Sequence, residues 1–209
     1  MEIKIKLMMK HAMKINTRYY LTFLIILTVQ LSSCQVIMDL ETYAVYADDQ
    51  EISIPDDVTY IKDVNNSLAP YLGTFIGTYN GNTITFTITK LTETDWITRD
   101  ILNIKYKIED ANGNILVQTF NFPDNSHDIS GIYLDSQGQY IAYYHGFDAT
   151  GFDECGQSGT FSLYINPLSS NQMKVYLANS TDILLQDDCP NGETPHVFPA
   201  NVLFTLTRI

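Results

Sequence analysis

The sequence is poor in the residues and motifs on which most enzymes and metal-binding proteins depend. It has three cysteines, one tryptophan and four histidines in 209 residues. Neither a C-x-x-C nor an H-x-x-x-H spacing occurs, so no zinc site is expected. The G-x-S-x-G turn of serine hydrolases is missing as well. We therefore expect neither enzymatic activity nor a cofactor. Paired carboxylates of a glycosidase meet only in space, which leaves that one class of enzyme open.

Basic residues are scarce after position 18. Removing residues 1–33 takes away five of the 12 basic residues and one of the 24 acidic ones, and leaves the remaining chain with a net charge of −16. A surface of this charge repels the phosphates of nucleic acids and anionic lipid head groups. The composition therefore excludes nucleic acid as a partner.

Two acidic loops carry the oxygen ligands that calcium prefers, at 148–154 and 187–188. Neither has the order of ligands found in an EF-hand. The nearest approach to a metal or acid–base cluster joins the first loop to a histidine, through His145, Asp148, Asp153 and Glu154. His127 and His196 each stand alone. We interpret these carboxylates as solvated loop residues, and no metal site is predicted.

The chain begins with the pattern of an export signal. Residues 1–18 carry five basic side chains, and an apolar run follows from about Tyr20 to Leu31. That run is about a dozen residues long, short of the roughly 20 that a membrane-spanning helix needs. Translation from Met13 would also leave a compact basic segment before the apolar run, so either methionine is a candidate start.

The apolar run ends in Leu31-Ser32-Ser33-Cys34, which resembles the lipobox of bacterial lipoproteins. In that family the cysteine thiol is acylated, the chain is cut before the cysteine, and the new amino group is usually acylated too. The resemblance implies a signal peptide at 1–33 and a lipid anchor on Cys34, which would hold the mature chain on a membrane. The alternative is a secretory signal with a cysteine near its end by chance, since signal cleavage sites favour small residues.

Residues 34–51 are acidic and polar, with Asp39, Glu41 and the stretch 48–51. We expect them to form a tether between the anchor and a single domain at 52–209, a length suited to one core. In some bacterial groups, acidic residues after the lipidated cysteine route lipoproteins to the outer membrane or the cell surface. The expected location is therefore the outer membrane, on its periplasmic face or at the cell surface.

Only Cys155 and Cys189 remain beyond Cys34. In an exported protein a lone pair of cysteines is more often a disulfide than a metal site or a nucleophile. The bridge would close a loop of about 35 residues and stabilise the fold by roughly 4 kcal/mol. Two free thiols would follow if these positions lay at opposite ends of the fold.

Alternating apolar and polar residues dominate the domain, and the clearest case is the segment 71–91. Ile84, Phe86 and Ile88 share one face of an extended strand, and threonines occupy the other. Asn80-Gly81 suits the tight turn before that strand. About nine strands are expected, at 73–79, 82–91, 101–109, 114–120, 128–134, 139–145, 160–165, 172–178 and 202–209. Two short edge strands at 52–55 and 58–61 and a helical turn within 63–71 precede them.

This spacing predicts an all-β fold, an antiparallel up-and-down β-barrel of about 8–10 strands with a short N-terminal helical turn. Closing the sheet with its last strand removes the exposed edges. The inward face of the strands would form the barrel lining, made by Phe86, Ile88, Leu102, Ile104, Tyr106, Phe161 and Leu163. This lining either packs solid or holds a small apolar ligand, and solid packing is usual in small barrels.

The segment 60–81 resembles the start of an uncharacterised family of small exported proteins and lipoproteins of flavobacterial-type bacteria, a domain of unknown function. The matching residues are Lys62, Asp63, Asn65, Asn66, Gly73, Thr74, Gly77 and Gly81, and Phe75 replaces a tryptophan. More distantly, the segment is similar to lipocalin-type barrels, in which a basic residue of the last strand packs over the aromatic ring of the first. That resemblance implies a cation–π contact between Arg208 and Phe75.

Two functions remain open for such a barrel. The first is a lipid-anchored, non-catalytic protein that binds a small apolar ligand inside or packs solid. The second is a surface module that binds glycan or protein through outward aromatic side chains such as Tyr164 and Tyr176. A ligand that co-purifies with the protein would favour the first, and affinity for a polysaccharide would favour the second.

Overall fold

A computed structural model describes residues 35–49, 51–124, 128–145, 147–148, 151–152, 157–166, 169, 171–180 and 197–209. The chain divides into two compact units, Met1–Val36 and Ile37–Ile209. Nearly all of the described residues belong to the second unit. None of the helices within the described ranges is long and apolar enough to cross a membrane.

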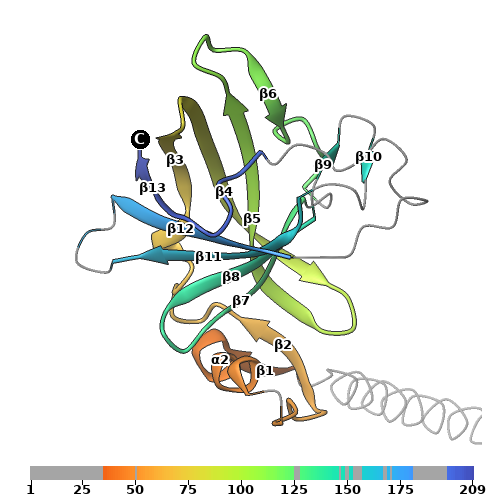
Figure 1. Cartoon of the computed structure of the whole chain (residues 1–209). Helices are drawn as coiled ribbons and strands as arrows, with labels where there is room; N and C mark the ends of the chain where they lie inside the picture. Colours follow the sequence, from red (N-terminus) through yellow and green to blue (C-terminus); the bar gives the residue numbers. More distant parts are fainter. Residues whose placement is uncertain are drawn as a thin grey trace, which may run out of the picture. The chain divides into compact units, whose positions relative to one another are not determined.

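Eight antiparallel strands close into a barrel (Figure 1). Neighbours in the barrel follow one another along the chain, which is the up-and-down order expected from the sequence. The barrel closes where β13 pairs with β3, with Arg208 opposite Phe75, and where Asn103 of β5 faces Ser130 of β7. In order the strands are β3 (Gly73–Tyr79), β4 (Asn82–Thr94), β5 (Thr98–Glu109), β7 (Ile129–Leu134), β8 (Gln139–Tyr144), β11 (Gly159–Ile165), β12 (Gln172–Asn179) and β13 (Leu203–Arg208).

The expected all-β barrel is confirmed, and several boundaries differ. The β4–β5 hairpin is longer than expected, with β4 reaching Thr94 and β5 beginning at Thr98. Residues 52–55 are not a strand, and β2 (Val58–Lys62) pairs in parallel with β5 outside the barrel. The remaining short strands are β6 (Ile115–Gln118), which pairs with β5, and the hairpin of β9 (Phe147–Asp148) and β10 (Gly151–Phe152).

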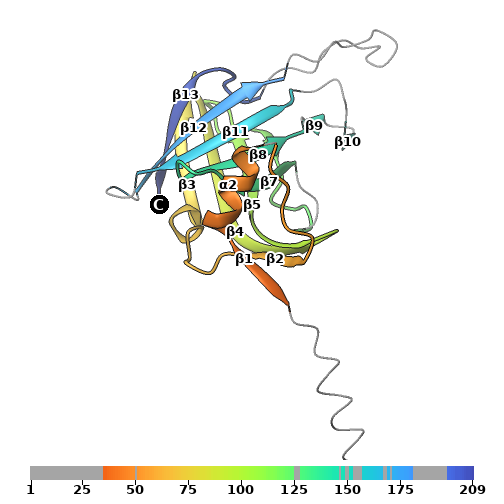
Figure 2. The ribbon, with the colours of Figure 1, turned by 90° about the horizontal axis from the view of Figure 1, so that it is seen from below.

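The expected acidic tether is wrong for most of its length. Strand β1 (Val36–Asp39) and helix α2 (Leu40–Asp48) occupy it. The Asp39 side chain caps the helix by accepting a hydrogen bond from the Thr42 N–H at 2.7 Å. Leu40 and Ala44 are buried, and α2 lies against the lower end of the barrel (Figures 1 and 2). Six of the nine helix residues are apolar, and the two acidic ones, Glu41 and Asp48, remain exposed to water.

The turn after β2 carries three of the eight residues that resemble the lipoprotein family, Asp63, Asn65 and Asn66. Asn66 adopts a positive φ of 57°, a conformation that asparagine tolerates better than most residues. Asn65 donates a hydrogen bond to the Glu41 carboxylate at 3.1 Å, and the Ser67 hydroxyl donates to the same carboxylate. The turn therefore fixes α2 to the barrel.

The barrel closes over an arginine, as the lipocalin resemblance implied. The Arg208 guanidinium lies 4.5 Å from the centre of the Phe75 ring, and it also donates to the carbonyl oxygens of Pro70 and Leu72. These carbonyls belong to the 3₁₀ turn η1 (Ala69–Tyr71) and the residue after it. At Gly77, a Cβ would lie 2.5 Å from the Thr205 carbonyl oxygen of β13, so glycine allows the close approach of the closing strands.

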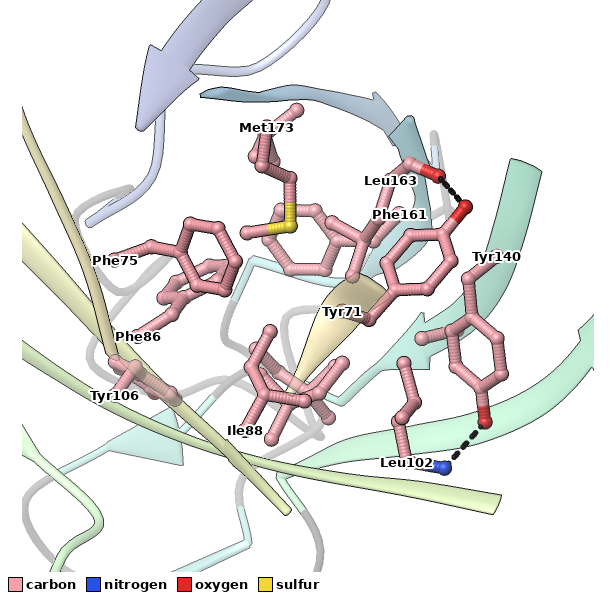
Figure 3. Close-up of a cluster of buried hydrophobic side chains, with 14 of the residues drawn as sticks. Tyr71, Phe75, Phe86, Ile88, Leu102, Tyr106, Tyr140, Phe161, Leu163 and Met173 are labelled. Carbon is pink, nitrogen blue, oxygen red and sulfur yellow. Dashed lines mark hydrogen bonds between the residues drawn. The ribbon is translucent and has the colours of Figure 1, made fainter. Parts of the chain in front are cut away.

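Figure 3 shows the packed centre of the barrel. Two buried tyrosines satisfy their hydroxyls on the backbone. The Tyr140 hydroxyl oxygen accepts a hydrogen bond from the Leu102 N–H at 2.8 Å. Tyr71 donates to the carbonyl oxygens of Gly138 at 2.7 Å and of Leu163 at 3.4 Å. These bonds join η1 and β8 to the rest of the barrel, because buried polar groups are costly unless paired.

Candidate functional site

The barrel interior is the first candidate site, and side chains fill it at the positions expected to line it. All seven expected lining residues are buried in one core cluster. The rings of Phe86 and Phe161 meet edge to face with centres 6.1 Å apart. At these positions the lining forms a packed core, which is the first of the two arrangements that the sequence allows.

Phe198, from the segment between β12 and β13, completes this packing. Its ring centre lies 4.8 Å from that of Tyr106, 5.1 Å from Tyr144, 5.2 Å from Phe161 and 5.9 Å from Phe86. Buried Gln157 holds the Phe198 backbone through two hydrogen bonds of 3.0 Å, one to its carbonyl oxygen and one from its N–H. Phe198 is therefore fixed among aromatic rings contributed by four strands.

A buried carboxylate lies beside this aromatic cluster. Asp128 is 3% exposed, and its Oδ2 accepts a hydrogen bond of 2.6 Å from the Tyr106 hydroxyl. Within the described residues, its Oδ1 has no hydrogen-bond partner. Burial raises the pKa of Asp128 to about 6, and the Tyr106 hydrogen bond offsets only part of that effect. Asp128 thus titrates in a range where ordinary aspartates remain ionised.

Two further buried carboxylates, Asp63 and Asp100, have hydrogen-bond partners. Asp100 accepts from the Tyr60 hydroxyl at 2.7 Å, the Thr92 hydroxyl at 2.8 Å and the Asp63 N–H at 3.1 Å. Burial would raise the pKa of Asp100, but these hydrogen bonds and nearby Lys90 hold it below its usual value. Lys90 also lies 3.4 Å from Asp63. This network joins β2 to β4 and β5.

The outer face of the barrel carries the second candidate site. Tyr176 on β12 lies opposite Ser162 on β11, and Tyr164 lies opposite Lys174, so the two tyrosines are diagonal neighbours on adjacent strands. Both rings are half-buried. The same cross-strand row continues to Ile141 on β8 and to Leu203 on β13, which is 58% exposed. The structure therefore brings together the outward tyrosines that the sequence singled out.

Helix α2 borders a shallow cavity of about 440 Å³ lined by Glu41, Thr42, Val45, Tyr46 and Ile52. Its charged group, Glu41, is already engaged by Asn65 and Ser67. This leaves no charged side chain in the cavity to orient a ligand. We assign no site there.

Several residues singled out in the sequence lie outside the described residues. They are Cys34, Cys155, Cys189, His127, His196, Asp153, Glu154, Asp187 and Asp188, so the disulfide and the lipid attachment stay predictions. His145 is exposed, and its ring lies 4.4 Å from that of Tyr143. Across the described ranges no three His, Cys, Asp or Glu side chains gather where a metal ion could bind.

Sequence reasoning missed Phe198, Gln157 and Asp128. Phe198 lies in an irregular segment with no periodicity to indicate that it points inward. Gln157 and Asp128 are polar residues at or just before the beginning of a strand, where exposure is the normal expectation. Only the three-dimensional packing identifies them.

The chain matches no protein-family model, no curated protein and no solved structure. The conclusions about function therefore rest on the residues and their geometry. The likeness to lipoproteins and to lipocalin-type barrels remains a resemblance of sequence.

Proposed function

We propose that this chain is an exported lipoprotein whose barrel is a rigid, non-catalytic binding module held at a membrane by a lipid on Cys34. The observation that carries the proposal is the junction between signal and domain. Strand β1 begins at Val36, two residues after the cysteine of the lipobox-like Leu31-Ser32-Ser33-Cys34. Cleavage before Cys34 would remove the signal peptide and leave every residue of the folded domain in place.

The chemistry of the anchor determines how firmly the protein is held. One acyl chain gives only marginal membrane binding, whereas two or three chains anchor a protein stably, at about 0.8 kcal/mol per buried methylene. The acidic domain itself has little attraction for anionic lipid. Attachment therefore depends on the lipid, and the proposed location is the outer membrane, on its periplasmic face or at the cell surface.

We expect Cys34→Ala to move the protein from the membrane fraction to the soluble fraction, because the substitution removes the acylated thiol. Cell fractionation with mass analysis of the mature N-terminus measures this, and the wild-type protein should carry acyl chains on Cys34. Ser33→Ala is the matched control, since it keeps a small residue before the cysteine. Retention of Cys34→Ala in the membrane, or an unmodified Cys34 in the wild type, would contradict the lipid anchor.

A specific observation favours the outer face of the barrel over its interior as the binding surface. The interior positions are occupied by interlocked rings, whereas Tyr164 and Tyr176 form a diagonal pair on the outside. Tyrosine rings offer an apolar face together with a polar tip. Hydroxyl and amide groups surround them, from Ser162 and Gln139 on the paired strands. This combination suits the faces and hydroxyls of sugar rings, and we propose a polysaccharide as the ligand.

We expect the double substitution Tyr164→Ala and Tyr176→Ala to weaken binding to a polysaccharide by about tenfold or more, because it removes two aromatic contacts of about 1 kcal/mol each. Retention on a panel of cellulose, chitin and starch particles provides the measurement. Tyr79→Ala, at the end of β3, is the control variant. If the wild-type protein is retained by none of these particles, or if the double variant binds equally well, the glycan proposal fails.

A further inference from the structure

Trp96 is the most exposed large aromatic side chain in the described part of the chain, at 73% exposure. It lies at the tip of the long hairpin that joins β4, ending at Thr94, to β5, beginning at Thr98. The next residue, Ile97, is buried, so the tip packs one side chain inward and presents the other to solvent. A large ring left mostly in water at a hairpin apex contributes little burial to the fold.

The strand pairing places this tip beside the start of the folded domain. Two residues after Trp96, Thr98 of β5 lies opposite Tyr60 of β2, and β2 in turn pairs with β1. Neighbouring strands lie about 4.8 Å apart, so β1 is about 10 Å from β5. In Figures 1 and 2 the β4–β5 tip lies on the side of the barrel that β1 and β2 occupy.

The chain itself limits how far a lipid on Cys34 can be from this side of the domain. Cys34 and Ile37 are three positions apart in the sequence, which an extended chain spans in at most about 11 Å. Ile37, on β1, is 47% exposed. A lipid anchored at Cys34 therefore leaves no long tether, and it brings the β1–β2–β5 edge close to the bilayer.

We propose that Trp96 inserts into the interfacial region of the lipid bilayer that holds the anchor, with Ile37 facing the same surface. The proposal rests on the lipid anchor proposed above. Tryptophan is enriched at membrane interfaces because its ring is apolar and its indole N–H remains able to bond with head groups or water. A second contact of this kind would fix the orientation of the barrel on the membrane, where a lipid alone would leave it free to rotate.

The surrounding charges indicate which lipid surface suits this contact. Asp95 precedes Trp96, and Asp56 and Asp57 are exposed just before β2. These carboxylates would be repelled by an anionic surface and not by a zwitterionic one. The expected partner is therefore a bilayer of zwitterionic lipid.

Trp96 is the single tryptophan of the chain, so its fluorescence reports on this position alone. The test uses the mature lipidated protein, purified from membranes and reconstituted into phosphatidylcholine vesicles with brominated acyl chains. We expect the Trp96 emission to shift to shorter wavelength and to lose intensity relative to vesicles without bromine. Co-flotation of the protein with the vesicles is measured on the same samples.

A relocated tryptophan supplies the matched control. In a variant with Trp96→Phe and Tyr79→Trp, the reporter lies beside the other end of β4, because Tyr79 pairs with Asn82. The 13 residues of β4 span roughly 40 Å. We expect this variant to float with the vesicles without quenching. If the wild-type protein floats but its Trp96 is not quenched more than the relocated tryptophan, the interfacial contact is wrong and the lipid anchor is supported. If neither protein floats, the lipid anchor is wrong, and the interfacial contact of Trp96, which depends on it, is wrong as well.

Discussion

Replacing Phe198 with alanine is expected to lower the free energy of unfolding by about 3–5 kcal/mol, the usual range for deleting a buried phenylalanine ring. The reason is its position among the rings of Phe86, Tyr106, Tyr144 and Phe161, all within 6 Å between ring centres. Gln157 holds its backbone at both polar groups, which limits how far the segment can collapse into the vacated space. Urea denaturation monitored by circular dichroism measures the change.

Val202→Ala is the matched control, because Val202 lies four residues further along the same segment and is 39% exposed. Surface substitutions of this kind change stability by less than about 0.5 kcal/mol. A loss of equal size in both variants would show that the segment contributes through its backbone and not through the Phe198 ring.

The same variant separates a solid barrel from a ligand carrier. An apolar cavity left by a deleted ring binds small aromatic molecules such as benzene, so benzene should restore part of the lost stability in Phe198→Ala. The wild-type protein should not respond, because Phe198 already fills that space. Stabilisation of the wild type by benzene to a similar extent would favour the carrier function.

The sequence determines the barrel in detail because its strands repeat a simple pattern. Ile84, Phe86 and Ile88 alternate with threonines, and each of the three is buried on β4 as expected. Asn80-Gly81 predicted the tight turn, and both residues have positive φ, at 49° and 85°. The resemblance to lipocalin-type barrels implied the contact between Arg208 and Phe75, and the structure has the Arg208 guanidinium 4.5 Å from the centre of the Phe75 ring.

The sequence failed where a residue's role depends on a distant partner. The sequence places Glu41 in an acidic tether, yet Glu41 receives hydrogen bonds from the turn at 65–67, whose donors lie 24 and 26 residues further along the chain. Phe198 becomes part of the core only because Gln157, 41 residues earlier, fixes its backbone. No local pattern encodes such contacts, because they require segments that are remote in sequence to be adjacent in space.

The pH dependence of stability follows from the burial of Asp128. Its pKa is raised from 3.8 to about 6 in the folded protein, so the folded state binds the proton more tightly than the unfolded state does. The resulting stabilisation is fully present below the unfolded pKa, near pH 4, and is lost as the pH rises through about 6. This difference between the unfolded and folded pKa of Asp128 corresponds to roughly 3 kcal/mol of unfolding free energy.

We therefore compare the unfolding free energy of the wild-type protein with that of Asp128→Asn at different pH values. Relative to the variant, the wild-type protein should become less stable by roughly 2–3 kcal/mol between pH 4 and pH 8. Asparagine keeps an oxygen that accepts the Tyr106 hydrogen bond, but it does not titrate. Asp110→Asn is the control, because hydrogen bonds from Asn114 and Asn112 lower the pKa of exposed Asp110 and place its titration below this range. Denaturation at a series of pH values measures all three proteins. A constant difference between wild type and Asp128→Asn would mean that folding does not raise the pKa of Asp128, and it would contradict this prediction.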